Sequence, residues 1–300
     1  MLLVRPSHPC DLQVGLGLGH SLLSLTSSTG RSAVAVEHFG GTGVVLGAYA
    51  HATRITVSNQ RVRRVSSGAP MFTDGAVYVG LALPSVDTLF KDASHRTLLN
   101  RNVRPLLSAL RRLRCAAVYL GRDWISAGPS SGRRALFGLG FEVTRPGTVL
   151  VEAIGSLRSE LRVPREEATD LELALQRYGS RPTLPLTEVT SDPVAWIESL
   201  RLALCEEVGA GRPSQLEHVQ PLPVSERDEG WTALGTTLEV PIGYLERTTK
   251  DGAVRVGGDL LTGGYCLEDL ERGLELHEDA PIDGATWSDV KAILRQTRPV

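Results

Sequence analysis

Residues with the chemistry to bind an anion gather in one stretch of the sequence, residues 61–84. It opens with three arginines, passes through the small residues 66–70, and reaches Asp74 and Gly75 ahead of an apolar segment. Small residues let a backbone approach a ligand closely, and the N–H groups of such a loop can bind an anion. Arginines beside the loop add bidentate contacts to a phosphate or a carboxylate. The alternative is an ordinary strand, loop and hairpin in which Asp-Gly makes the turn.

The composition narrows the function classes. The formal net charge is −2, whereas a general nucleic-acid-binding protein is usually clearly basic. Only three of the 32 basic residues are lysines, so a reaction that needs a lysine ammonium has few candidates. The four cysteines and seven histidines show no spacing typical of a zinc site or a disulfide framework. Because the sequence shows no signal peptide and no membrane-spanning run, we expect a cytoplasmic protein with no nucleic acid and no membrane among its partners.

Apolar spacing and turn residues predict the secondary structure. The expected strands are 33–38 and 44–49, with a turn at Gly40 and Gly41 between them, then 54–57, 77–83, 116–120, 137–143, 148–153, 238–242 and 253–256; the expected helices are 16–25, 98–113, 193–208, 267–274 and 287–294. Strands in runs with few intervening helices favour an α+β fold with a mainly antiparallel central sheet flanked by helices. We expect a main domain over 1–210, a linker over 211–235 and a small α+β accessory domain over 236–300.

Several segments, taken in order, resemble the lipoate-protein ligase family, within the superfamily that also holds biotin ligases and octanoyltransferases. The matching segments are 63–70 with 72–74, for the family's Arg-Arg-x-Ser-Gly-Gly-Gly and Phe-His-Asp-like pattern; 44–47, for its Val-Val-Ile-Gly-Arg strand; 121–123, for its Gly-x-Asn-Asp turn; 134–140, for its Lys-x-x-Gly strand; and 256–260 with 270–274, for its accessory domain. The resemblance covers about residues 10–280 and lies in the order and spacing of the motifs.

The resemblance implies both an activity and a site. The family activates lipoate or octanoate with ATP and Mg, and passes the acyl group from the adenylate to a lysine of a lipoyl carrier domain. The implied acyl-adenylate-binding residues are Gly47, Arg64, Ser66, Ser67, Gly68, Ala69, Asp123 and Gly138. A close-approach loop, a cation and an apolar wall suit an acyl-adenylate, because it carries one phosphate charge and a long apolar tail.

The family's catalytic lysine has no counterpart at the matching position. A gapless match at Gly138 puts Ala135 in its place, so Arg133 and Arg134 beside it are the catalytic residues that we expect if the chain is active. An arginine fork is not equivalent to the point charge of an ammonium. The other departures from the family pattern are at Gly15, Gly19, His20, Ala48, Ser67, Ala69 and Trp124.

Two hypotheses remain open. In the first, the chain is a divergent ATP-dependent lipoate- or octanoate-protein ligase or acyltransferase that acts on or binds the acyl group and a lipoyl carrier domain. In the second, it is a non-catalytic pseudo-ligase that serves as a binding or scaffold subunit for a partner protein. A thiol-based octanoyltransferase would need a cysteine in the acyl site. Cys115, ahead of an expected buried strand, is better explained as a core thiol.

Overall fold

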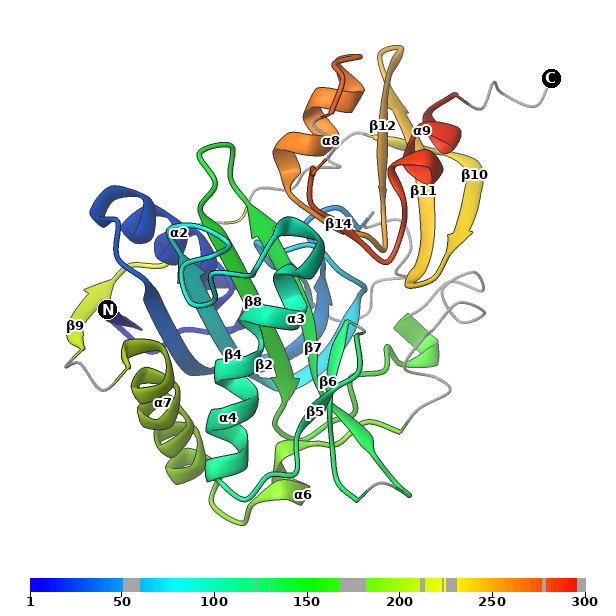
Figure 1. The fold of residues 1–300 in the computed structure, drawn as a ribbon. Helices are drawn as coiled ribbons and strands as arrows, with labels where there is room; N and C mark the ends of the chain where they lie inside the picture. The colour runs from blue at the N-terminus through cyan, green and yellow to red at the C-terminus, as the bar shows by residue number, and fades with distance from the viewer. Residues whose placement is uncertain are drawn as a thin grey trace.

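A large sheet forms the centre of the molecule (Figure 1). The computed structural model describes residues 1–50, 60–121, 123–129, 131–167, 182–210, 214–222, 224, 231–276 and 279–295. Within these residues the sheet has nine strands, in the order β5-β6-β7-β8-β4-β2-β1-β9, with β3 paired to β2. The strands are β1 (Leu2–Pro6), β2 (Ala33–Leu46), β3 (Gln60–Arg63), β4 (Met71–Leu83), β5 (Val118–Tyr119), β6 (Trp124–Ala127), β7 (Arg134–Val143), β8 (Val149–Ser156) and β9 (Gln215–Val219).

Most neighbouring strands of this sheet are antiparallel. From β5 to β2 every pair is antiparallel, whereas β1 pairs in parallel with β2 and β9, and β3 in parallel with β2. The predicted α+β fold with a mainly antiparallel central sheet is therefore confirmed. The strands expected over 137–143 and 148–153 are also confirmed, and they pair as the antiparallel hairpin of β7 and β8.

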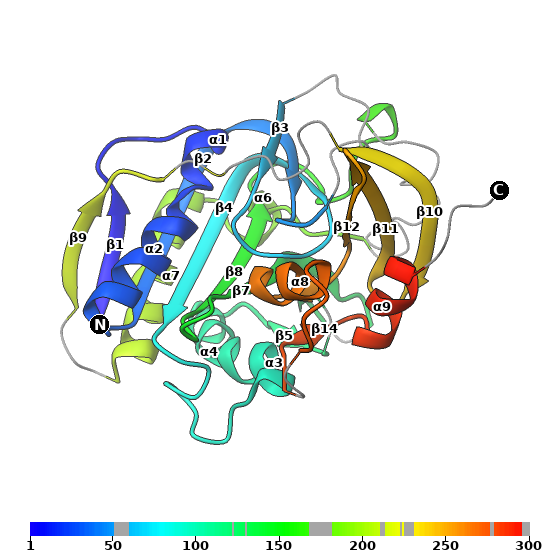
Figure 2. The same ribbon diagram turned by 90° about the horizontal axis from the view of Figure 1, so that it is seen from above.

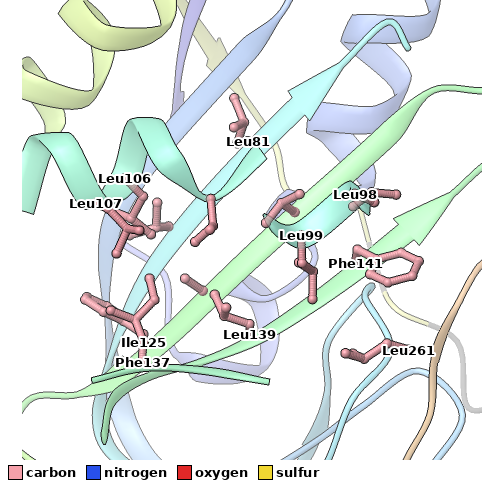
Figure 3. Packing of buried hydrophobic residues seen from close by; sticks show 14 of the residues in the cluster. Leu81, Leu98, Leu99, Leu106, Leu107, Ile125, Phe137, Leu139, Phe141 and Leu261 are labelled. Atoms are coloured by element: carbon pink, nitrogen blue, oxygen red, sulfur yellow. The ribbon is translucent and has the colours of Figure 1, made fainter. Parts of the chain in front are cut away.

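Helices cover both faces of the sheet, as alternation along the strands requires. On one face lie α1 (Leu12–Gly15) and α2 (Leu18–Thr29), and on the other lie α3 (Leu98–Asn102), α4 (Arg104–Arg112) and α7 (Pro193–Gly209). Three short helical segments complete the part of the molecule around the main sheet, namely η2 (His95–Thr97), η3 (Arg165–Glu167) and α6 (Leu186–Val189). Figure 3 shows leucines of α3 and α4 over Phe137, Leu139 and Phe141 of β7, where the larger core lies.

The helix boundaries follow from identifiable residues. Asp192 caps α7, since its Oδ1 accepts a hydrogen bond from the Ala195 N–H at 3.0 Å and Pro193 takes the first helical position. The single helix expected over 98–113 is instead two, α3 and α4, because Pro105 near the start of α4 has no N–H to continue the ladder.

The C-terminal residues form a smaller unit beside the main sheet. It contains the antiparallel strands β10 (Thr232–Val240), β11 (Gly243–Lys250) and β12 (Ala253–Gly258), the pair β13 (Leu261–Thr262) and β14 (Ile282–Asp283), and the helices α8 (Gly264–Glu271) and α9 (Trp287–Arg295). Strand β11 was not among the strands expected from the sequence. Figure 2 shows α8 lying beside the ends of β7 and β8, so this C-terminal unit borders the main domain there.

Two expected turns proved wrong. Strand β2 runs on through Gly40 and Gly41, and β4 runs on through Asp74 and Gly75. The pairing of β2 with β4 shifts register at this point, and φ is +99° at Gly41 and +72° at Gly75. These are the features of a β-bulge, in which glycine at positive φ takes up an extra residue without ending the strand.

Three other expectations differ from the structure or fall outside it. The strand expected over 116–120 is only the two-residue edge strand β5, and Leu120 beyond it is 57% exposed, so the prediction of a buried strand was wrong. The expected linker, 211–235, contains β9, which pairs with β1 along five residues. The strand expected over 54–57 lies outside the described residues. The domain boundaries themselves stay a prediction.

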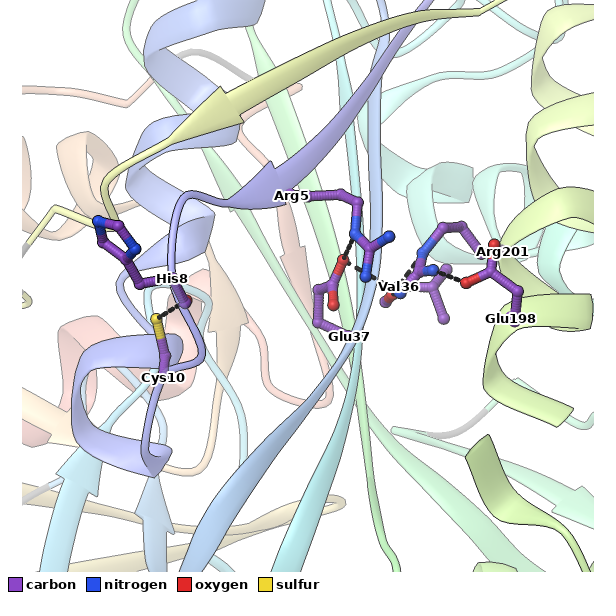
Figure 4. A network of polar contacts seen from close by, with 7 residues as sticks. All are labelled: Arg5, His8, Cys10, Val36, Glu37, Glu198 and Arg201. Carbon is purple, nitrogen blue, oxygen red and sulfur yellow. Dashed lines mark hydrogen bonds and ion pairs between the residues drawn. The ribbon is translucent and has the colours of Figure 1, made fainter. Parts of the chain in front are cut away.

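A buried ion pair fixes α7 to the sheet (Figure 4). The Arg201 guanidinium donates to the Val36 carbonyl at 2.9 and 2.7 Å, and lies 3.1 Å from Glu37 Oε1. Arg5 donates to the same oxygen at 3.1 Å. Burial raises the pKa of the Glu37 carboxyl, while Arg201 and Arg5 act in the opposite direction. Removing Arg201 would therefore leave the buried Glu37 carboxylate with Arg5 as its remaining basic partner among the two described here.

Candidate functional site

The loop between β3 and β4, residues 64–70, is built on close backbone contacts. A Cβ added to Gly47 would lie 2.0 Å from the carbonyl oxygen of Gly68, so the end of β2 touches the loop with no room for a side chain. Gly68 has φ +125°, and a Cβ there would lie 2.1 Å from Arg64 Nη2. Glycine is thus required at both positions by geometry alone. The resemblance had assigned both to ligand binding.

Two arginines at the start of the loop, Arg63 and Arg64, are buried and donate hydrogen bonds to backbone carbonyls. Arg63 Nη1 donates to the carbonyls of Gly47 at 2.8 Å and Ala50 at 2.7 Å. Arg64 is fully buried, and its Nη2 donates to the Leu139 carbonyl of β7 at 3.3 Å. These charged donors fix the conformation of the segment that follows β2 and its position against β7.

A buried glutamate reaches the start of the loop from β8. Glu152 Oε2 accepts a hydrogen bond from the Ser66 backbone N–H at 2.7 Å, and Oε1 accepts one from the Tyr78 hydroxyl at 2.8 Å. Burial, with the neighbouring carboxylate, raises the pKa of Tyr78 well above its ordinary value. A Cβ on Gly19 would lie 2.5 Å from Glu152 Oε1, so glycine at this position lets α2 pack directly on the carboxylate.

Ser67 closes the loop from both sides. Its N–H and Oγ donate to the Phe141 carbonyl of β7 at 3.1 and 2.7 Å. The same Oγ accepts from the Thr262 N–H of β13 at 3.1 Å. Ser66, Ser67 and Ala69 are consequently buried, the last 5% exposed. The predicted binding segment is covered by the protein itself.

Three further contacts hold the C-terminal unit against this region. Glu142 of β7 accepts hydrogen bonds from the Gly264 N–H at the start of α8, at 2.7 Å, and from the Tyr49 hydroxyl. The Gly258 N–H donates to the Tyr49 carbonyl at 2.7 Å. Arg145 binds Asp269 in a bidentate pair at 3.1 and 2.9 Å.

The expected catalytic arginines lie at the start of β7, away from the loop. Arg134 pairs with Glu188 of α6 through both guanidinium nitrogens, one at 3.0 Å. This bond lowers the pKa of the Glu188 carboxyl. Arg134 is five residues, roughly 17 Å, along β7 from Leu139, whose carbonyl meets Arg64. Arg133 precedes Arg134, and Ala135 is 2% exposed.

The structure therefore brings together six of the predicted residues and leaves the others apart. Gly47, Arg64, Ser66, Ser67, Gly68 and Ala69 form one packed group. Asp123 is buried, and its carbonyl accepts from the Leu139 N–H at 2.7 Å. Gly138 pairs across the sheet with Trp124 and Ile154. The roles of all these residues in ligand binding stay predictions.

A cavity of about 660 Å³ lies between the main domain and the C-terminal unit. Its lining includes His20, Leu23, Arg63, Arg64, Val65, Glu142, Arg145, Val224, Arg255, Tyr265, Glu268 and Glu271. We call it the junction cavity. Of the predicted binding residues only Arg64 lines it. From the sequence, His20 was recognisable only as a departure from the family pattern, because the other lining residues come from segments far apart in the chain.

Comparisons with known proteins establish the fold. No protein-family model matches the sequence, and no curated protein does. Among solved structures the chain is similar to a bipartite lipoate protein ligase from Thermoplasma acidophilum, described with its E2 lipoyl domain, at TM-score 0.56 and 13% identity over 76% of this chain and 88% of that chain. It is also similar to a putative lipoate protein ligase from T. acidophilum with bound lipoic acid, at TM-score 0.53 and 14% identity over 76% and 90%.

A third similar structure is a lipoate-protein ligase A bound with ATP, at TM-score 0.51 and 13% identity over 74% of this chain and 89% of that chain. At such identities the likeness gives the fold, which is that of the lipoate-protein ligases. No helix in the described part of the chain is long and apolar enough to cross a membrane. Within the same residues, no group of three or more His, Cys, Asp and Glu side chains could hold a metal ion.

Proposed function

We propose that this chain is a non-catalytic, lipoate-ligase-like binding protein that docks a lipoyl carrier domain and does not form an acyl-adenylate. The observation that carries the proposal is the buried hydrogen bond from the Ser66 N–H to Glu152 Oε2, at 2.7 Å. A carboxylate of the protein itself occupies the backbone donor of Ser66, a residue that the resemblance assigns to acyl-adenylate binding. The loop is thus supplied with an internal anion.

A second anion at this loop would be repelled. Two like charges 4 Å apart interact with about 4 kcal/mol at an effective dielectric constant of about 20. A penalty of that size weakens binding roughly a thousandfold. A phosphate would also have to break the 2.7 Å bond between Ser66 and Glu152. ATP with Mg, which the resemblance implies, therefore does not fit this loop as it is arranged here.

Arg134, one of the two cations expected to serve adenylation, is paired with a carboxylate of the protein itself. Arg134, the first residue of β7, makes a bidentate pair with Glu188 of α6. Ala135, which matches the family's lysine, carries only a buried methyl group. These placements support a protein that has kept the ligase frame for binding. The role of Arg133 stays a prediction.

The proposed partner is a lipoyl carrier domain. A solved structure with the same fold, from T. acidophilum, is described together with its E2 lipoyl domain. We extend that pairing to the present chain as a proposal. The lipoyl or octanoyl group would then be recognised on the carrier rather than activated by the protein.

The test combines a reaction and a titration on the full-length protein. The protein is incubated with ATP, Mg²⁺ and either lipoate or octanoate, and pyrophosphate and acyl-AMP are measured. We expect neither above the level of a protein-free control, whereas a lipoyl carrier domain should bind saturably in calorimetry and an unrelated domain of equal charge should not. Acyl-dependent pyrophosphate release contradicts the proposal, and so does failure to bind the carrier domain in both its unmodified and lipoylated forms.

A divergent ligase or acyltransferase is the second candidate, and one observation favours it. The side chains of Arg134 and Glu188 are 27% and 51% exposed. Because surface ion pairs contribute only about 0–1 kcal/mol, an acyl carboxylate could replace Glu188 at small cost. If the wild type releases pyrophosphate, this candidate predicts that Arg134→Met abolishes the release while Arg112→Met, at another surface pair, does not.

A further inference from the structure

We propose that the outer side of α4, with the groove beside its start, docks an acidic, extended peptide segment of a partner protein. The groove has a volume of about 530 Å³ and lies between the loop after β4, the first turns of α4 and the end of α7. Its wall includes Leu89, Phe90, Arg104, Pro105, Ser108 and Val208. None of these residues belongs to the loop at 64–70 or lines the junction cavity, so this surface is separate from the proposed function.

Positive charge is concentrated in residues 93–122, although the formal net charge of the chain is −2. This segment holds seven arginines and neither an aspartate nor a glutamate. Its helix α4 lies beside α7 on one face of the main sheet (Figure 1). The leucines of α4 face the core, whereas Arg104 and Arg111 are exposed. These two arginines are two helical turns apart, roughly 10 Å along the same side of the helix.

Other elements supply carboxylates to three of the seven arginines. The pairs are Arg96 with Asp279, Arg101 with Asp92, and Arg112 with Glu206 and Glu207. Glu207 also lines the groove, but its carboxylate lies 2.6 Å from the Arg112 guanidinium and is therefore already paired. Arg114 follows the end of α4, and Arg122 is outside the described residues.

Arg104 and Arg111 have no carboxylate within 4 Å among the residues that the structure describes. Arg104 lies over the Phe90 ring, with its guanidinium carbon 5.7 Å from the ring centroid. Arg111 Nε donates to the Ala117 carbonyl at 3.3 Å. Each guanidinium is thus held in position by a neutral group and keeps N–H donors for a carboxylate. The ligand that completes both is an acidic side chain.

The groove next to Arg104 fits an apolar side chain between two acidic ones. Its apolar wall is formed by Leu89, Phe90, Pro105 and Val208. A peptide in the polyproline II conformation advances about 3.1 Å per residue with three residues per turn. Acidic residues three positions apart therefore share one side of the peptide and span roughly 9 Å, which matches the spacing of the two arginines.

Nucleic acid is the other polyanion that binds arginine-rich surfaces. Its affinity comes from neutralising many phosphates along a continuous basic surface, with bases stacked on aromatic rings. On α4 the carboxylates of Glu206 and Glu207 lie against Arg112, and Arg104 covers the Phe90 ring. Two unpaired arginines beside an apolar groove favour a peptide.

Calorimetric titration of the full-length protein with the blocked peptide Glu-Glu-Leu-Pro-Glu-Glu tests the proposal. We expect saturable binding at about 50 mM salt, at least about fivefold weaker binding at about 0.5 M salt, and no measurable binding when glutamine replaces every glutamate. Oligo-dT of about 12 nucleotides is the nucleic-acid probe. No saturable binding of the acidic peptide, equal affinity for the glutamine peptide, or tighter binding of oligo-dT than of the acidic peptide overturns the proposal.

Variants place the binding on α4. Because Arg104 and Arg111 are exposed and have no paired carboxylate in the described part of the chain, replacing both with glutamine should leave the fold intact. We expect the double variant Arg104→Gln, Arg111→Gln to bind the acidic peptide at least about fivefold more weakly. Arg272→Gln, at an exposed arginine outside the groove, should bind it like the wild type. Wild-type affinity in the double variant, or an equal loss in Arg272→Gln, contradicts the assignment.

Discussion

The side-chain oxygen of Ser67 accepts a hydrogen bond from the backbone N–H of Thr262 at 3.1 Å, across 195 residues of sequence. The same oxygen donates to the Phe141 carbonyl at 2.7 Å. One hydroxyl thus connects the loop, β7 and the C-terminal unit. The resemblance placed glycine at this position. In this chain the Ser67 hydroxyl bonds the loop to both β7 and the C-terminal unit, and these bonds keep the loop buried.

Ser67→Ala should destabilise the protein. The change leaves the buried Thr262 N–H without its acceptor, and such a loss costs about 1–3 kcal/mol. Ser66→Ala is the matched control, because Ser66 is equally buried and its Oγ has no hydrogen-bond partner among the described residues. We expect Ser66→Ala to change the free energy of unfolding by less than about 0.5 kcal/mol. Equal losses in urea denaturation of the two variants would contradict the role given to Ser67.

Gly140→Ala tests how closely the loop is seated on β7. A Cβ at Gly140 would lie 2.1 Å from the Ser67 carbonyl oxygen and 2.5 Å from Ser66 Oγ. Since the backbone at Ser67 is fixed by its N–H bond to the Phe141 carbonyl and its carbonyl oxygen cannot move aside freely, we expect a loss of about 1–3 kcal/mol or more. A Cβ at Gly132 would meet nothing within 4 Å, so Gly132→Ala should be nearly neutral. A stable Gly140→Ala protein with the wild-type melting curve would show that the loop is not seated in this way.

Arg201→Met and Arg134→Met should differ sharply in stability. Arg201 is 3% exposed and compensates Glu37 inside the protein, and breaking a buried pair costs about 3–5 kcal/mol. Arg134 pairs with Glu188 at the surface, where the loss is about 0–1 kcal/mol. Chemical denaturation of both variants measures the difference. Similar losses would mean that the two pairs are equivalent, contrary to their burial.

His20 gives stability a defined pH dependence. Its pKa is lower in the folded protein than its ordinary value of 6.5, so below that pH the unfolded chain binds more protons. The free energy of unfolding therefore falls as pH drops through the region just below 6.5. We expect the decline between pH 7.5 and 5.5 to be smaller in His20→Gln than in the wild type and in His218→Gln. Parallel curves for all three proteins would contradict the lowered pKa.

Local signals made part of the fold predictable from the sequence. The β7–β8 hairpin follows from a Pro-Gly turn between two apolar runs, and α7 from the Asp-Pro start that the structure shows as its cap. The turns at Gly40-Gly41 and Asp74-Gly75 were misread because turns and bulges both favour glycine at positive φ, as at Gly41 and Gly75, and only the partner strand distinguishes them. The parallel pairing of β1 with β9 joins residues about 213 positions apart and has no local signal.

The candidate site was less predictable for the same reason. The order of motifs located Gly47 and the residues of the loop, which the structure packs into one group. It gave no indication that Glu152 would reach Ser66, since that bond spans 86 residues. The junction cavity combines α2, β7, α8 and the segment around Arg64. Only the folded chain brings those side chains to one wall.

In the proposed function, Glu152 occupies the place of a ligand phosphate at Ser66. The most direct test of this claim is a calorimetric titration of the wild-type protein with a stable sulfamoyl analogue of lipoyl-adenylate, which needs no catalysis to bind. We predict no saturable binding in the wild type up to millimolar concentration. Saturable, stoichiometric binding at micromolar concentration that competes with ATP would contradict the claim and identify the loop as an intact adenylate site.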